Sequence, residues 1–229
     1  MKKKRRIILS LSAILQSILF AILLTIGIGY LIGYRAYLVN GWSSEPEIMY
    51  QSIVINYKQS HESLYKEFAE SHQIDGNTFK ANEDGKNIYV TFTSDNRSFT
   101  THTIVAMKPQ GEYFEEGETV TFDNMGITFV RKVGKECQII TMTNNENSYQ
   151  SFINEVKNNS DGVSVGSNGP GFEQNNFENI SGRVLYSNEK VGQFLFFARN
   201  NFMQIIVYVI ILYIANEIIK FVPAYIKNY

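Results

Sequence analysis

The sequence predicts a mainly β fold, in which an antiparallel β-sheet domain lies between an N-terminal and a C-terminal transmembrane helix. Three observations support this fold class: an uncharged run of 27 residues near the N-terminus, a series of short alternating runs through the middle, and a second apolar run near the C-terminus. The 229 residues are 44% hydrophobic and 19% charged, an average that would describe one soluble domain. The three parts differ so strongly that this average describes none of them.

The first apolar run, residues 7–33, reads IILSLSAILQSILFAILLTIGIGYLIG and contains no charge. As a helix it is long enough to cross a hydrocarbon core of about 30 Å. A cleaved signal peptide is the alternative, but its apolar core usually has about 7–15 residues and ends at a small-x-small site. Five basic residues precede the run, and such residues stay in the cytoplasm. We therefore expect a multi-pass protein of the cell membrane, with residues 1–6 cytoplasmic, 7–33 in the bilayer and 34–201 on the extracytoplasmic side.

The second apolar run, residues 202–220, reads FMQIIVYVIILYIANEIIK, and its strictly apolar part, Ile205–Ala215, has only 11 residues. That length alone fits a buried strand or helix about as well as a membrane span. The flanks favour a span, because Tyr208 and Tyr213 suit the membrane interface and Lys220 suits the cytoplasmic side. Residues 221–229 would then form a cytoplasmic tail.

The middle of the chain alternates apolar and polar residues over short runs, which turn-rich stretches such as NEDG and NNEN separate. This pattern is typical of antiparallel strands and hairpins rather than of βαβ units. Residues 60–71 instead place apolar side chains at helical spacing, while residues 157–179 are rich in Asn, Gly and Ser and predict a long exposed loop. The predicted strands are Ser52–Asn56, Asn87–Phe92, Thr103–Met107, Thr119–Phe122, Ile127–Val133 and Gln138–Met142.

Charge and cysteine content exclude several classes of function. Residues 34–201 hold 14 Lys and Arg against 21 Asp and Glu, so no basic patch for nucleic acid exists outside the N-terminus. The single cysteine, Cys137, excludes an intrachain disulfide and a Cys-rich zinc site. The three histidines, His61, His72 and His102, are scattered, so we expect no metal and no organic cofactor. His61 and His72 flank the predicted helix and are expected at the surface.

The segment that follows the first apolar run, NGWSSEPEIMYQSIVIN, begins with two serines and a proline. Ser and Pro are common in loops, so Ser-x-x-Pro alone specifies nothing. In its order of residues, however, the segment resembles the nucleophile box of type I signal peptidases, in which Ser-Gly-Ser-Met-Glu-Pro follows the membrane anchor and a Gly-Ser-apolar-Val-Ile strand comes next. The resemblance puts Ser43 on the nucleophile, Glu45 and Pro46 on the Glu-Pro pair, and residues 52–55 on the strand.

Two further segments match the same family in order. GKNIYVTFTSDNRSFTTHTIVAM resembles its Gly-Asp-Val-Ile-Thr-Phe strand, hairpin and Thr-His-Arg-Ile-Val, and NISGRVLYSNEKVGQFLFF resembles the closing segment that leads back to the membrane. Thr101 and His102 fall on the Thr-His of the endoplasmic-reticulum-type branch, which is also found in archaea and some bacteria. The resemblance implies that His102 replaces the lysine base of the other bacterial enzymes, which makes Lys132 a strand lysine.

This resemblance implies a serine peptidase mechanism. A serine hydroxyl is a poor nucleophile until a base takes its proton, and imidazole, with an ordinary pKa of about 6.5, does so near neutral pH. A carboxylate then orients the ring. The family supplies it from Thr-Lys-Gly-Asp-Ala-Asn, whose nearest equivalent here is TMTNNENSYQSF. Glu146 is therefore the expected acid, with Glu155 and Asp161 as alternatives.

The chain also departs from the family pattern. Trp42 replaces a glycine, Ser44 the methionine and Thr103 the arginine after the histidine. Gly41 replaces a serine, which removes one side-chain donor to the oxyanion and leaves the backbone N–H of Ser43.

The expected function is that of a membrane-bound signal peptidase I, a serine endopeptidase that removes N-terminal signal peptides from exported preproteins after small residues. Its partners would be signal-peptide-bearing preproteins and the lipid bilayer. Trp42, Ile48 and Met49 lie beside the nucleophile and are expected to bind the substrate as an added strand. The alternative is a non-catalytic, membrane-anchored binding or assembly protein on the same β fold.

Overall fold

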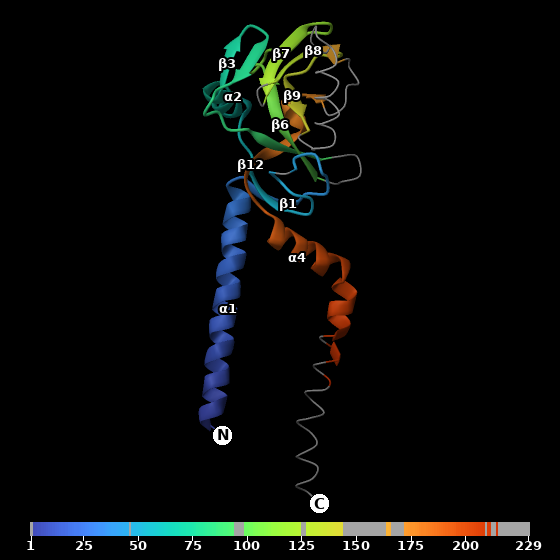
Figure 1. Ribbon diagram of the computed structural model, residues 1–229. Helices are drawn as coiled ribbons and strands as arrows, with labels where there is room; N and C mark the ends of the chain where they lie inside the picture. The colour runs from blue at the N-terminus through green and yellow to red at the C-terminus, as the bar shows by residue number, and fades with distance from the viewer. Residues whose placement is uncertain are drawn as a thin grey trace, which may run out of the picture.

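A β domain with two helical legs makes up the chain, and both legs leave the domain at the same end (Figure 1). The computed structural model describes residues 2–45, 47–93, 99–124, 127–143, 164–165, 172–208, 210–211 and 214. The first leg is helix α1 (Lys2–Leu31). The second leg begins with α4 (Glu189–Asn200) and continues as helix over residues 202–208.

The β domain is built on a seven-stranded sheet with the order β1-β2-β12-β5-β6-β9-β11, in which all neighbouring strands are antiparallel. Strand β12, from the C-terminal end of the domain, lies between β2 and β5. The sheet therefore forms only when segments far apart in the sequence pair with one another. The strands are β1 (Tyr34–Leu38), β2 (Ile53–Tyr57), β5 (Tyr89–Thr93), β6 (Phe99–Met107), β9 (Ile139–Met142), β11 (Phe172–Asn175) and β12 (Ile180–Asn188).

A second, five-stranded sheet has the order β10-β8-β7-β4-β3. Two antiparallel hairpins, β3–β4 and β7–β8, form most of it, and the pairs β4–β7 and β8–β10 are parallel. Its strands are β3 (His72–Asp75), β4 (Thr78–Ala81), β7 (Thr119–Asn124), β8 (Ile127–Lys132) and β10 (Ser164–Val165).

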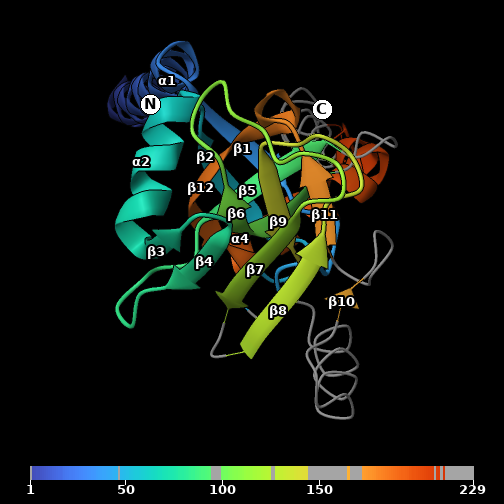
Figure 2. The same cartoon turned by 90° about the horizontal axis from the view of Figure 1, so that it is seen from above.

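The hydrophobic core lies between the two sheets and beneath helix α2 (His61–Ser71). Leu64 and Phe68 of α2 pack in one buried cluster with Phe122 of β7 and with Ile104 and Ile140 of the large sheet. Figure 2 shows β7 and β8 crossing over β6 and β9, with α2 along one flank. The large sheet therefore supports side chains on β6, an interior strand that lies between β5 and β9.

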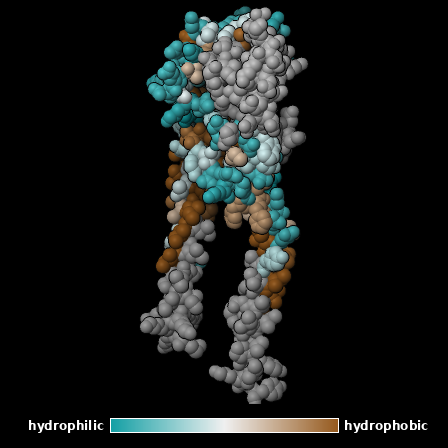
Figure 3. All heavy atoms as spheres, in the orientation of Figure 1, coloured by the Kyte–Doolittle hydropathy of each residue, from teal (hydrophilic) through white to brown (hydrophobic). Residues whose placement is uncertain are grey.

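Both legs expose apolar side chains. On α1, Phe20 is 68% exposed and Ile26 is 63% exposed, and on the second leg Phe194 is 66% and Met203 is 71% exposed. In Figure 3 the coloured upper parts of the legs are mostly brown, and the coloured part of the domain above them is mostly teal. Within the described part of the chain, no helix combines the length and the hydropathy that crossing a membrane requires.

The predicted mainly β, antiparallel domain is confirmed, and so is the helix predicted over residues 60–71. Each of the six predicted strands coincides with an observed one, although β6 begins earlier, at Phe99.

The exposed loop predicted over residues 157–179 is wrong in part. Residues 172–175 form β11, and a 3-10 helix follows over Phe177–Asn179. Apart from residues 164–165, the rest of residues 157–171 lies outside the described residues. β11 exists because it pairs with β9 far back in the chain, an interaction that local composition does not encode.

Candidate functional site

Ser43 lies in a loop, residues 40–51, whose two ends are tied together at their base. The backbone N–H of Val39 donates to the carbonyl of Ser52 (2.9 Å), and that of Gln51 donates back to the carbonyl of Val39 (3.1 Å). We call residues 40–51 the serine loop. Two further bonds brace it from within, from the backbone N–H of Ile48 to the Ser44 carbonyl (2.9 Å) and from that of Tyr50 to the Glu45 carboxylate (3.0 Å).

The serine loop is bound to the first residues of β6, the strand that carries His102. The backbone N–H of Asn40 donates to the carbonyl of Phe99 at 2.9 Å. The hydroxyl of Ser44, which is buried, donates to the carbonyl of Thr101. These two hydrogen bonds attach the loop to β6 on either side of Ser43. They therefore fix the position of the loop relative to β6.

Close approach of the loop to β6 depends on Gly41. A Cβ at this position would lie 2.9 Å from Thr100 Cγ2 and 3.7 Å from Ser43 Oγ, so a larger side chain would push the loop away from the strand. The half-buried Ser43 and Thr100, two residues before His102, therefore both lie close to Gly41. The hydroxyl of Ser43 and the ring of His102, both described, form no direct hydrogen bond; such bonds in substrate-free enzymes are often long and tighten on binding.

The imidazole of His102 is buried in the large sheet, with its side chain only 3% exposed. Its Nδ1 lies 3.4 Å from Thr141 Oγ1 of β9 and 3.5 Å from Glu173 Oε2 of β11. The ring of Phe92 packs against it from β5, at 5.3 Å between centroids. Since Nδ1 faces two acceptor oxygens, a proton on Nδ1 leaves the lone pair of Nε2 free to accept another.

The carboxylate beside His102 is Glu173, which the sequence did not single out. Sheet register explains its position, because Glu173 pairs with Thr141 and lies on the same face as the imidazole. Glu146 and its alternatives, Glu155 and Asp161, lie outside the described residues. Glu173 falls in the stretch predicted as a loop, where the run FEQN is too short to show the alternation typical of a strand.

Burial and Glu173 act in opposite directions on the pKa of His102. Burial, the larger effect, lowers that pKa below its usual value because a charged ring would lose its hydration, while the negative charge of Glu173 raises it. His102 is therefore neutral at pH 7, which is the state that a general base needs.

The three residues predicted to bind substrate occupy different environments. Trp42 is 55% exposed and stacks on Tyr50, with 4.3 Å between ring centroids and 11° between planes. Met49 is also exposed. Ile48 is buried and packs with Val54 in a small core beneath the serine loop, so it supports the loop from inside.

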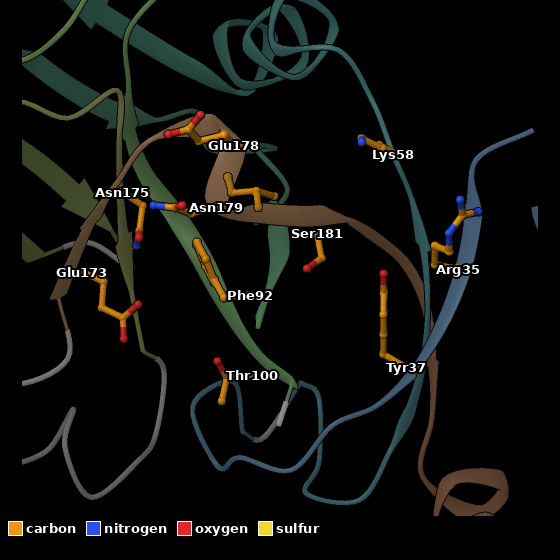
Figure 4. Close-up of a pocket in the computed structure, with 11 residues that line it drawn as sticks. Arg35, Tyr37, Lys58, Phe92, Thr100, Glu173, Asn175, Glu178, Asn179 and Ser181 are labelled. Atoms are coloured by element: carbon orange, nitrogen blue, oxygen red, sulfur yellow. The ribbon is translucent and has the colours of Figure 1, made fainter. Parts of the chain in front are cut away.

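A cavity of about 730 Å³ opens beside the loop contact at Thr100. Figure 4 shows Glu173 and Thr100 on one side of it and Arg35 and Tyr37 of β1 on the other. The cavity therefore runs from the carboxylate beside His102 towards β1, the strand that follows α1. Its lining is largely polar, as suits the backbone of an extended peptide.

The remaining histidines are structural. The expectation that His61 lies at the surface is wrong: it is 6% exposed and meets the Phe177 ring edge-on at 5.1 Å. His72 is half-buried and stacks on Phe68 at 4.1 Å. Burial lowers the pKa of both rings.

Lys132 is an exposed lysine at the end of β8. In the described ranges, no three His, Cys, Asp or Glu side chains gather closely enough to hold a metal ion.

A serine on a braced loop, a neutral buried imidazole on the adjoining strand, and a carboxylate at that imidazole are the parts that nucleophilic acyl transfer requires. The sequence singled out Ser43 and His102 and missed Glu173. No protein-family model, curated protein or solved structure matches the chain.

Proposed function

We propose that the chain is a membrane-bound serine endopeptidase of the signal peptidase I type, which removes N-terminal signal peptides from exported preproteins. Ser43 is the nucleophile and His102 its general base. Glu173 orients the imidazole and stabilises its charged form, the role for which the sequence favoured Glu146.

The observation that carries this proposal is the attachment of the serine loop to β6. The bonds of Asn40 to Phe99 and of Ser44 to Thr101 hold the segment that contains Ser43 beside the strand that carries the buried His102 imidazole. A peptide carbonyl bound here would be attacked by Ser43 Oγ while the hydroxyl proton passes to His102 Nε2. His102 then gives that proton to the leaving amine, the Ser43 N–H donates to the oxyanion, and water hydrolyses the acyl-enzyme.

The legs support the membrane part of the proposal. The described side chains of α1 leave large apolar groups such as Phe20 and Ile26 exposed, with no protein surface against them. At the end of α1, the Arg35 guanidinium donates to the carbonyl of Tyr30 (2.6 Å) and lies 3.6 Å from the centre of its ring. Arginine and tyrosine at a helix end are typical of the membrane interface. We therefore place α1 and the part of the second leg that begins at residue 202 in the bilayer, with residues 34–201, including α4, on the extracytoplasmic side.

This arrangement favours substrates that share the membrane. A signal peptide emerges from the bilayer close to its cleavage site, so holding enzyme and substrate in one bilayer raises their effective concentration. The exposed Trp42 and Met49 offer apolar surface beside Ser43, and small residues at the cut would let an extended chain approach the loop.

The test is cleavage of a preprotein by the purified full chain in detergent or liposomes. Ser43→Ala should lower kcat by at least about 10⁴-fold, because no other group supplies the attacking oxygen. Ser63→Ala is the matched control, since Ser63 is an exposed serine on α2, and it should retain full activity.

A parent chain that cuts after Ala-x-Ala, and stops cutting when bulky residues replace both alanines, supports the signal peptidase assignment. A Ser43→Ala chain that keeps its biological activity would instead identify the non-catalytic binding or assembly protein.

A further inference from the structure

Helix α4 is seated directly on the backbone at the base of the serine loop. A Cβ added at Gly192 would lie 2.5 Å from the carbonyl carbon of Ser52, and closer still to Gln51 O and Ile53 N. Only glycine permits this approach. Sheet register brings α4 there, because Asn188, the last residue of β12, pairs with Ile53 and caps the helix by accepting from the backbone N–H of Val191 at 3.0 Å.

The backbone under this seat is held in an unfavourable conformation. Gln51 has φ +63°, the single positive φ among the described non-glycine residues. The left-handed region is unfavourable for a residue with a side chain, so the surrounding structure must enforce it. Two groups do so: the carbonyl of Val39, which accepts from Gln51 N at 3.1 Å, and Gly192, packed on the Gln51 carbonyl.

A second contact joins the same helix to the residue next to Ser43. The ring of Phe196, one turn after Gly192, lies 6.2 Å from the ring of Tyr50, and Tyr50 stacks on Trp42 at 4.3 Å. Phe196 of α4 therefore lies against the Tyr50–Trp42 stack, which ends at the immediate neighbour of the proposed nucleophile.

We propose that α4 is a positioning element for the serine loop, and that Gly192 and Phe196 hold Ser43 at β6 through the backbone of residues 51–53 and through the contact of Phe196 with the Tyr50–Trp42 stack. The catalytic consequence rests on the proposed function, whereas the mechanical contact does not. Gly192 and Phe196 are positioning residues, since neither touches the reacting atoms.

The single tryptophan of the chain provides a direct readout, because Trp42 is itself a member of the stack. In the full chain in detergent, Phe196→Ala should shift the emission of Trp42 to longer wavelength and increase its quenching by acrylamide. The same variant should lower kcat by about tenfold, since misplacing a reacting group by a fraction of an ångström has effects of this size. Gly192→Ala should act in the same direction, and more strongly. Phe197→Ala is the control: its ring is 59% exposed, and it should change neither signal.

Unchanged Trp42 emission and quenching in Phe196→Ala would overturn the proposal, whatever happens to activity. A shifted emission with unchanged kcat would overturn the catalytic part. If Gly192→Ala does not fold, Phe196→Ala decides, because it removes a half-buried ring without forcing a backbone clash. The fluorescence test needs no turnover. A parent chain that cleaves no preprotein would refute the proposed function, but the emission of Trp42 would still test whether α4 positions the serine loop.

Discussion

Burial sets the charge of His102, the proposed base, and the neighbouring Glu173 opposes its effect. Burial keeps His102 neutral as the pH falls below about 6.5, the ordinary pKa of histidine. Glu173 opposes this effect, because its negative charge favours the imidazolium. The same attraction stabilises the imidazolium that forms when His102 takes the proton of Ser43. Since the Glu173 side chain is 53% exposed, water screens the interaction and its effect on rate is moderate.

Glu173→Gln should therefore have two effects. It removes the influence that raises the pKa of His102, so the acid limb of the kcat profile should move to lower pH. It also removes the counter-charge to the imidazolium, so the plateau value of kcat should fall by about tenfold. The measurement is kcat for a preprotein between pH 4.5 and 8.5, values chosen on either side of about 6.5.

Glu178→Gln is the matched control for this prediction. Glu178 is an exposed carboxylate that lines the same cavity, in the 3-10 helix that follows β11. Its profile should superimpose on that of the parent chain. An acid limb that stays in place in Glu173→Gln, or moves equally in both variants, would show that Glu173 does not act on His102.

At the scale of the elements, α2 depends on a side-chain cap. The hydroxyl of Ser60 accepts from the backbone N–H of Ser63 at 3.2 Å and so satisfies one of the free donors at the helix N-terminus. Ser60→Ala should lower the free energy of unfolding by about 1 kcal/mol. The measurement is denaturant unfolding of the β domain in detergent.

Ser63→Ala keeps the donated N–H and changes only an exposed hydroxyl, so it should leave the stability nearly unchanged or raise it slightly. Equal losses in the two variants would mean that the hydroxyl of Ser60 contributes nothing as a cap.

The helix and the hairpin strands were predictable because their signals are local. Leu64 and Phe68 recur at helical spacing, and Ser60 stands where an N-cap belongs. The strands β5, β7, β8 and β9 carry β-branched or aromatic residues between turn-rich stretches. For such elements, the pattern within about ten residues decides the structure.

Other elements depend on partners far away in the sequence. β11 holds one apolar residue, Phe172, and becomes a strand only because β9 presents a free edge to it. The candidate site shares this dependence. Ser43 and His102 were identified from a resemblance, but Glu173 joins them only through the order of three strands, β6, β9 and β11. Gly41 was interpreted as a lost donor, whereas the structure shows that it lets the loop approach Thr100.

At the scale of the whole molecule, both legs leave the β domain at one end (Figure 1), which is the geometry that two spans in one bilayer require. β1 follows α1 and begins at Tyr34, opposite Tyr57, whereas β12 ends before α4 at Asn188, opposite Ile53, so the two legs join the sheet at opposite ends of β2. The serine loop runs between β1 and β2. The proposed nucleophile therefore lies in a loop next to β1, the strand that follows the first leg, at the end of the domain from which the legs leave (Figure 1).

This geometry predicts a membrane topology that cysteine labelling can test, because we expect the natural chain to react little with thiol reagents. Its one cysteine, Cys137, is 2% exposed, and burial raises the pKa of the thiol to about 11, so little reactive thiolate forms. Glu83→Cys puts a thiol on an exposed turn of the β domain, and Lys3→Cys puts one in the basic N-terminal segment.

A membrane-impermeant maleimide should label Glu83→Cys in intact cells and should label Lys3→Cys only after the membrane is opened with mild detergent. The parent chain should remain unlabelled in both conditions and react once denaturant exposes Cys137. The reason for the difference is the basic N-terminus, which resists transfer across the bilayer while the acidic middle of the chain crosses. Labelling of Lys3→Cys in intact cells would show that the N-terminus lies outside the cell, which is the opposite of the predicted topology. Protection of Glu83→Cys until detergent is added would put Ser43 on the cytoplasmic side, away from the emerging signal peptide, and would remove the reason for assigning exported preproteins as its substrates.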